Sequence, residues 1–246
     1  MKGFEMSDYD NTREFSAPTD LFAVAAAADE RAGFIAKTYL YLTGAIFVFA
    51  AIEAVLLNLP GIEGLIFMMI GNKLSWLIVL GLFIGTSHIA NVWAQNATSS
   101  GTQHAGLALY VVAQSIIFLP LLSIAQMFGG PGTIASAAGA TLGLFGVLTV
   151  IVFLTRQDFS FLRVFLIFGC FAALGFIVVS ILCGFELGPI FIYAMIAFAC
   201  CYILYDTSNV LHHYRIGQHV AASLALFASV ALLFWYILQL FLSRNE

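Results

Sequence analysis

The chain has 246 residues, of which 62% are hydrophobic and only 9% are charged, and its mean hydropathy is +1.01. Soluble domains carry about 25% charged residues, so this composition excludes an ordinary soluble domain and indicates an integral membrane protein. The net charge of −4 shows no basic excess. We therefore expect the lipid bilayer as a partner and no nucleic acid.

The first 33 residues are polar and carry more acidic than basic side chains. A secretory signal needs a basic start followed at once by a short apolar core, and this segment lacks both. We expect residues 1–33 to form a polar cytoplasmic tail, with a short interfacial helix around residues 21–31. Residues 34–246 are expected to form the transmembrane domain.

Seven apolar stretches predict seven transmembrane helices, because a helix needs about 20 apolar residues to cross the hydrocarbon core. They lie at 34–57, 74–93, 105–128, 132–154, 161–183, 188–210 and 218–242. Turn-forming or charged residues separate them. The predicted fold class is therefore all-α, an integral membrane protein with seven spans.

The Lys and Arg residues predict the orientation of these spans. Seven of the nine lie on one face, in the tail, at the start of the first span and in the loops after the fourth and sixth spans: Lys2, Arg13, Arg31, Lys37, Arg156, Arg163 and Arg215. Cytoplasmic loops carry the excess of positive charge. We therefore expect a cytoplasmic N-terminus and an outside C-terminus.

A stripe of small residues marks the fourth span, where Ala135, Gly139 and Gly143 recur every four residues. Small residues at this spacing allow two helix backbones to approach closely within a membrane. We expect this stripe to be a helix-packing face and not a ligand site.

Asp206 is the carboxylate that the sequence places deepest within an apolar run, between residues 201 and 209. An aspartate at the centre of a membrane helix costs about 2.5–3.5 kcal/mol on insertion scales, so it is seldom present without a partner or a function. Asp206 is therefore the first candidate for a gating or ion-path residue.

Other polar residues in or near the spans are further candidates. Glu53 could line an outer vestibule, although a residue so near the interface can also reach water. His88 could face the interior, either as a packing histidine or as a neighbour of Asp206. His212 and His213 are candidates for sensing cytoplasmic pH, with an ordinary interfacial loop as the alternative.

The remaining features predict structure and not chemistry. Arg156 and Asp158 are expected to form an ion pair that fixes the turn after the fourth span. The cysteines, at positions 170, 183, 200 and 201, form no Cys-x-x-Cys pair and have no histidine at metal-ligand spacing. No nucleotide-binding or catalytic motif is present in the sequence. We therefore expect no metal site, no cofactor and no enzymatic activity.

Two motifs resemble the signatures of the Bax inhibitor family, including its bacterial YccA-like branch. One is TRQDFSFL at residues 155–162, and the other is LYDTSN at residues 204–209, followed by His212. The resemblance covers roughly residues 31–246. It implies a fold in which six helices surround a more central C-terminal helix, and it implies a location in the bacterial inner membrane.

The resemblance also implies a role for Asp206. Some family members are described as pH-sensitive calcium leak pathways, in which aspartates on the sixth and seventh helices share a proton and hold the path shut. Asp206 matches the first of these positions, whereas Ser229 stands at the second. Calcium prefers several oxygen ligands with more than one charge, so the loss of the second aspartate weakens the expectation of a calcium gate.

Of the two functions that follow from the resemblance, the sequence favours the first, and the second is the alternative. The first is a stress-protective regulator, because the bacterial branch is associated with modulating a membrane-anchored ATP-dependent protease, which the tail would contact. The second is a leak pathway for calcium, other cations or protons that is gated by Asp206.

Overall fold

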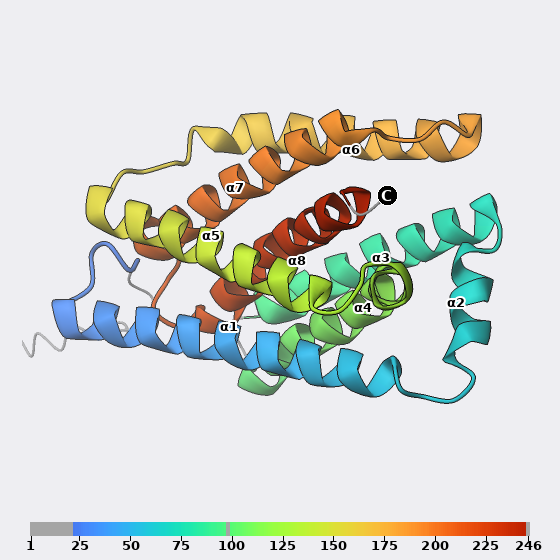
Figure 1. Ribbon diagram of the computed structural model, residues 1–246. Coiled ribbons are helices and arrows are strands. Elements are labelled where there is room, and N and C mark those ends of the chain that lie inside the picture. The colour runs from blue at the N-terminus through green and yellow to red at the C-terminus, as the bar shows by residue number, and fades with distance from the viewer. Residues whose placement is uncertain (1–21, 97–98, 245–246) are drawn as a thin grey trace, which may run out of the picture.

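The computed structural model describes residues 22–96 and 99–244, which form eight α-helices (Figure 1). These are α1 (Ala28–Leu56), α2 (Ile62–Ile70), α3 (Lys73–Ala94), α4 (Ser100–Phe128), α5 (Thr133–Thr155), α6 (Leu162–Cys183), α7 (Pro189–His212) and α8 (His219–Ser243). All of them except α2 are long and apolar enough to cross a membrane. The predicted all-α fold with seven spans is confirmed.

The N-terminal boundary differs from the expectation. Residues 22–27 form a turn, and α1 begins at Ala28, so the described residues form no separate interfacial helix before the first span. Asp29 and Glu30 lie in the first turn of α1, where negative side chains stabilise the helix end. The part of the expected tail at residues 1–21 lies outside the described residues.

The short helix α2 was not expected from the sequence. Its nine residues cover about 14 Å at 1.5 Å per residue, which is too short to cross the bilayer. It begins after Gly61, which adopts the left-handed conformation with φ 85°. Ile66 and Met69 are buried, whereas Phe67 and Met68 are exposed, so α2 covers one end of the bundle with one face only.

Helix α8 is the central element of the bundle. It is the most deeply buried of the seven spanning helices, and it packs against α1, α3, α4, α5 and α7. Helix α6 lies further out and packs mainly against α7 (Figure 1). The expected central position of the C-terminal helix is confirmed.

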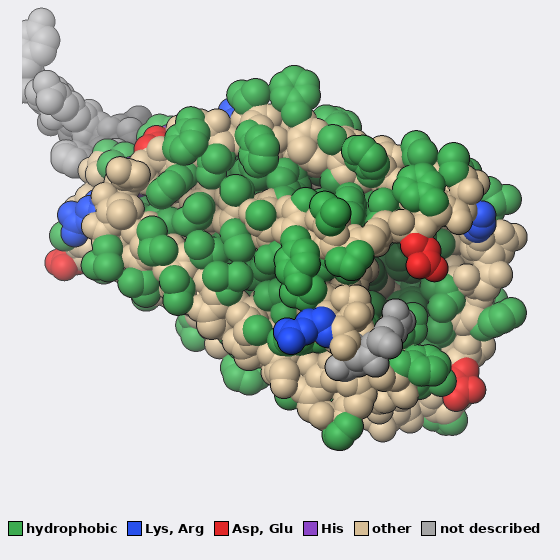
Figure 2. Space-filling view, turned by 45° about the horizontal axis from the view of Figure 1, so that its top comes forward, with side chains coloured by type: hydrophobic (Ala, Val, Ile, Leu, Met, Phe, Trp, Pro, Cys, Tyr) green, Lys and Arg blue, Asp and Glu red, His purple; other side chains and the backbone are tan. Residues whose placement is uncertain are grey.

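The bundle has two ends that carry different connections. The start of α1 and the α3–α4, α5–α6 and α7–α8 connections meet at one end, called here the tail end. Helix α2, the α4–α5 and α6–α7 connections and the end of α8 meet at the other, called the α2 end. Between the ends, hydrophobic side chains dominate the face shown in Figure 2, as expected for a surface in contact with acyl chains.

Helices α3 and α4 approach each other closely at Gly106. A Cβ atom on Gly106 would lie 2.6 Å from the carbonyl oxygen of Ala90 and 2.6 Å from the amide nitrogen of Ala94. Backbone atoms cannot rotate away from such a contact as a side chain can. The absence of a side chain at Gly106 is therefore a condition for packing α4 against α3.

The small-residue stripe of α5 does not form a packing face. Ala135, Gly139 and Gly143 are exposed, and a Cβ atom on either glycine would meet nothing within 4 Å. Helix α5 instead buries the opposite side, which carries Thr141 and Phe145. The prediction from spacing was wrong because small residues permit a close approach but do not require a partner on that side.

Candidate functional site around Asp206

The centre of the candidate site is Asp206, which lies in the last two turns of α7 and is 9% exposed. Ser229 of α8 is buried, and its hydroxyl lies within hydrogen-bonding reach of the Asp206 carboxyl. The same hydroxyl lies 3.2 Å from the carbonyl oxygen of Ala225 and 3.0 Å from that of Leu226. Because a hydroxyl has one proton to donate, Ser229 can donate a hydrogen bond either to a carbonyl oxygen of its own helix or to the Asp206 carboxyl.

Two tyrosines complete the immediate surroundings of this carboxyl. Tyr110 of α4 and Tyr214 of the α7–α8 turn lie in electrostatic range of Asp206. Burial, followed by the negative charge of Asp206, raises the pKa of Tyr214 above its ordinary value of 10.0. The phenol of Tyr214 therefore stays protonated at neutral pH, so it can donate a hydrogen bond.

The residue after Asp206 contributes to a second polar cluster. The hydroxyls of Thr207, Tyr39 and Thr149 lie close together, from α7, α1 and α5 respectively. Each hydroxyl is buried without a direct hydrogen-bond partner among the described residues. Because buried polar groups are nearly always hydrogen-bonded, this cluster is a place where water would be held between the three helices.

The segment that precedes α1 covers the α7–α8 turn at the tail end. The amide of Ala23 donates to the carbonyl oxygen of Tyr214 at 2.9 Å, and the guanidinium of Arg215 lies 5.5 Å from the ring centre of Phe22. Ala23 is fully buried. Residues 22–23 are therefore part of the wall on the tail-end side of Asp206.

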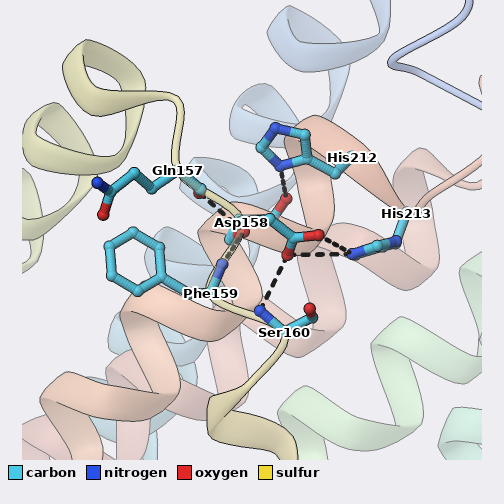
Figure 3. A network of polar contacts seen from close by, with 7 residues as sticks. Gln157, Asp158, Phe159, Ser160, His212 and His213 are labelled. Carbon is cyan, nitrogen blue, oxygen red and sulfur yellow. Dashed lines mark hydrogen bonds and ion pairs between the residues drawn. The ribbon is translucent and has the colours of Figure 1, made fainter.

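The two sequence motifs that suggested the family meet at the tail end (Figure 3). The hydroxyl of Ser208 accepts a hydrogen bond from the Phe159 amide at 2.9 Å and donates to the Gln157 carbonyl oxygen at 3.3 Å. His212 donates from Nδ1 to the Ser208 carbonyl oxygen at 3.0 Å. These contacts fix the α5–α6 connection to α7, two residues after Asp206.

Asp158 is held by His213, and the expected pair with Arg156 is not among the ion pairs of the described residues. The His213 Nε2 lies 3.1 and 3.2 Å from the two carboxylate oxygens, and the Ser160 amide donates to the same carboxylate at 2.9 Å (Figure 3). The pairing differs because the end of α7 brings His213 across the turn. Partial burial raises the pKa of Asp158, but the bonds from Ser160 and His213 outweigh it and lower the pKa below 3.8.

The variant Asp158→Asn is expected to lower the thermal unfolding midpoint slightly at pH 7, because exposed ion pairs contribute about 0.2–1 kcal/mol. A carboxyl whose pKa is lowered in the folded state stabilises the protein above its ordinary pKa of 3.8, and this contribution is lost as the pH falls through the folded value. Melting curves in detergent should therefore differ between parent and variant at pH 7 and converge at an acidic pH, once the pH has fallen through the lowered pKa of Asp158. An equal difference at both pH values would contradict this interpretation.

A cavity of about 620 Å³ leads from the α2 end toward Asp206. Glu186 and Ser243 line it at the α2 end, and Gln114 and Tyr110 line its deepest part on α4. Its lining on α4 runs from Ile124 to Tyr110, which spans about 21 Å at 1.5 Å per residue. The cavity therefore extends along about half of α4 and ends at Tyr110, which lies near Asp206.

The other candidates from the sequence do not join this site. Glu53 is buried, but it lines a different cavity between α1, α4, α5 and α8. His88 is exposed on α3, so the structure does not bring it together with Asp206. His212 and His213 lie at the tail end and support the α5–α6 connection, as described above.

Sequence reasoning missed a cluster of rings at the tail end. His104 donates from Nδ1 to the Ser100 carbonyl oxygen at 2.6 Å, so in the neutral ring its Nε2 accepts from the Tyr41 hydroxyl at 2.8 Å. Tyr41 also lies against His219, with ring centres 5.1 Å apart. Nothing in the spacing of these residues could have indicated a contact between α1, α4 and α8.

Within the described ranges, no group of three or more His, Cys, Asp or Glu residues is placed to hold a metal ion. Asp206 brings one carboxyl to its site, whereas calcium takes six to eight oxygen ligands. The surroundings of Asp206 therefore do not fit a resident calcium site.

The fold and this site define a seven-span membrane protein with a buried acid on its sixth span and a central seventh span. The chain matches the family described as "Inhibitor of apoptosis-promoting Bax1" over residues 31–246, and it belongs to that family. The assignment agrees with the two motifs that meet at the tail end.

Three proteins are similar to this chain over 65% to 85% of its length. The chain is 28% identical to Bax inhibitor 1 of Schizosaccharomyces pombe over 217 aligned residues, and the alignment covers 85% of this chain and 76% of that protein. It is 30% identical over 219 residues to the BI1-like protein of Arabidopsis thaliana, and this alignment covers 85% of this chain and 80% of that protein. It is 30% identical over 165 residues to an uncharacterized protein of Pseudomonas aeruginosa, and this alignment covers 65% of this chain and 69% of that protein. Assignment to the bacterial YccA-like branch stays a prediction.

Proposed function

We propose that this protein is a pH-sensitive cation leak pathway that is closed at Asp206. The observation that supports it is the cavity that runs from the α2 end to Tyr110, beside the Asp206 carboxyl. In this proposal the tail end faces the cytoplasm, because most Lys and Arg residues lie at that end.

The cavity is long enough that only a short closed segment separates its inner end from the tail end. Its lining on α4 covers about 21 Å, while the hydrocarbon core is about 30 Å thick. Tyr110, Asp206 and Tyr214 occupy the remaining part, and residues 22–23 cover Tyr214 from the tail end. A small displacement of these groups would connect the cavity to the tail end.

Asp206 gives this barrier its pH dependence. A carboxylate attracts cations when it is ionised and loses this attraction when it is protonated. Because Asp206 is a single carboxyl in this site, a cation would pass it in transit and would not be held there. Calcium and protons are the permeant ions that the experiment below distinguishes.

Regulation of a membrane-anchored ATP-dependent protease stays a prediction. It depends on the acidic tail, and most of the tail lies outside the described residues. A stress-protective role and a location in the bacterial inner membrane likewise remain predictions that follow from the family resemblance.

Flux measurements in liposomes test the leak proposal. Vesicles are loaded with a calcium-sensitive or a pH-sensitive dye and contain either the parent protein or Asp206→Asn. We expect the parent to pass calcium or protons at a rate that changes between about pH 5 and 8, and we expect the variant to lose this pH dependence. The two dyes report which ion passes.

The variant Asp158→Asn is the matched control, because it makes the same chemical change outside the cavity and is expected to keep the pH profile of the parent. A parent protein that leaves both dyes silent over the whole pH range would overturn the proposal. An unchanged pH profile in Asp206→Asn would assign the pH dependence to another group and would also overturn it.

A further inference from the structure

A second cavity, of about 300 Å³, lies on the opposite side of α8 from the first. Helices α1 and α5 form its sides, and α8 forms its floor; α1 and α5 both pack against α8 but make little contact with each other. Toward the tail end the ring of Tyr39 closes the gap, with ring centres 6.5 Å from Phe145 and 6.0 Å from Phe153. The result is a groove between α1 and α5 in the half of the bundle nearer the α2 end.

The groove is separate from the cavity that leads to Asp206. The two cavities share no lining residue, because α8 presents a different stripe to each: Phe227, Val230, Ala231 and Phe234 to the groove, and Ala228, Leu232, Trp235 and Gln239 to the other cavity. A ligand in the groove would therefore be bound independently of the leak pathway proposed above.

Glu53 is the group in the groove with unused hydrogen-bonding capacity. Its side chain is 4% exposed, and neither carboxyl oxygen has a hydrogen-bond partner within residues 22–96 and 99–244. The other polar residue of the lining is Thr141, whose hydroxyl donates to the Ala137 carbonyl oxygen at 2.7 Å. The remaining lining side chains are apolar. A single acid thus lies unpaired in an apolar groove.

This arrangement defines the chemistry of a ligand. Burying a polar group without a hydrogen-bond partner costs free energy, and burying an unpaired carboxylate costs more. A positively charged N–H donor would therefore be stabilised at Glu53 by a charge-assisted hydrogen bond. The rest of the ligand must be apolar to match the lining, and it must be compact, because ligand pockets range from about 300 to 1,000 Å³.

The position of Glu53 matches the orientation of an amphiphile in a bilayer. Glu53 lies in the last turn of α1, near the membrane interface, where charged head groups lie. The lining continues from Leu57, directly after α1, to Ile46 on α1, about 16 Å toward the centre of the bundle at 1.5 Å per residue. A molecule with a charged head at Glu53 would lay its apolar body along Phe49 and Ile46.

We propose that the groove between α1 and α5 binds a lipophilic amine, with its protonated amino group against Glu53 and its apolar body against α8. The amine enters sideways from the bilayer half nearer the α2 end. An apolar chain without a charged head would fill the groove equally well but would leave Glu53 unpaired.

Equilibrium dialysis of the full chain in a neutral detergent tests this proposal with two radiolabelled probes. They are 4-phenylbutylamine and 4-phenylbutanol, which differ in the charged amino group. We expect the parent to bind the amine at least about tenfold more tightly than the alcohol, and we expect Glu53→Gln to lose this preference. Glu63→Gln, the same change at an exposed position on α2, should retain it.

A steric variant keeps the test decisive if Glu53→Gln does not fold. Ala138→Phe leaves Glu53 in place and fills the groove from α5, so it should weaken binding of both probes, while its melting curve shows whether the bundle is intact. Equal binding of amine and alcohol to the parent would mean that the groove takes acyl chains, and it would overturn the proposal. So would an amine preference that survives in Glu53→Gln.

Discussion

Replacing Gly106 with alanine is expected to destabilise the protein by about 1–3 kcal/mol, and leucine at the same position is expected to prevent accumulation of folded protein. The new Cβ atom would lie 2.6 Å from backbone atoms of Ala90 and Ala94, so α4 must move away from α3. Since about 1 kcal/mol corresponds to 2–4 °C in a chain of this size, the unfolding midpoint of the alanine variant should fall by several degrees.

The same substitution at Gly143 is the matched control. Gly143 is exposed on α5, and a Cβ atom there would meet nothing within 4 Å. Alanine favours a helix over glycine by up to about 1 kcal/mol, so Gly143→Ala should keep or raise the midpoint. Thermal unfolding in detergent, followed by size-exclusion chromatography, measures both variants. A similar response at the two positions would contradict the close contact between α3 and α4.

The seven spans could be predicted because an uninterrupted apolar run of about 20 residues has one main physical interpretation. The runs expected at 132–154 and 161–183 correspond to α5 (Thr133–Thr155) and α6 (Leu162–Cys183). Helix α2 could not be predicted in this way, because nine mostly apolar residues are too few to span and can equally form a loop or a buried segment.

Helix packing was less accessible from the sequence. The spacing of Gly139 and Gly143 is typical of a packing face, yet both lie exposed, whereas the single glycine at position 106 makes the close contact. Which side of a helix is buried depends on its neighbours, and the sequence of one helix does not contain their positions. Small residues within a membrane therefore indicate where helices can approach and not where they do.

Some residues of the candidate site could be selected from the sequence, and others could not. Asp206 could be selected from the sequence because a carboxylate within an apolar span is rare, and the family resemblance placed Ser229 opposite it. Tyr110 and Tyr214 could not be selected, because they reach Asp206 from α4 and from the α7–α8 turn. The sequence also could not tell that Glu53 lacks a hydrogen-bond partner among the described residues, since this depends on the side chains around it from four helices.

Replacing Ser229 with aspartate is expected to shift the pH dependence of the leak by about one pH unit or more toward higher pH. The Ser229 hydroxyl lies within hydrogen-bonding reach of Asp206, so the new carboxyl would be adjacent to it. Two carboxyls at this distance cannot both ionise without strong repulsion, and they favour sharing a proton. If a protonated Asp206 closes the path, then the shared proton keeps it closed at pH values at which the parent already conducts.

Two substitutions separate this effect from a change of size or polarity. Ser229→Asn is close to aspartate in volume, does not ionise and keeps an N–H donor, so it should leave the shift absent. Ser229→Ala removes the hydroxyl donor without adding a charge, so any shift that it produces should be smaller than that of Ser229→Asp. Ion flux into liposomes is measured from about pH 5 to 9 for all three variants, because the shared proton is expected to leave above neutral pH. A profile for Ser229→Asp that coincides with that of Ser229→Asn would mean that the new carboxyl does not interact with Asp206. The shared-proton argument for Ser229 and Asp206 would then fail, while the comparison of the parent with Asp206→Asn would still decide whether Asp206 sets the pH dependence.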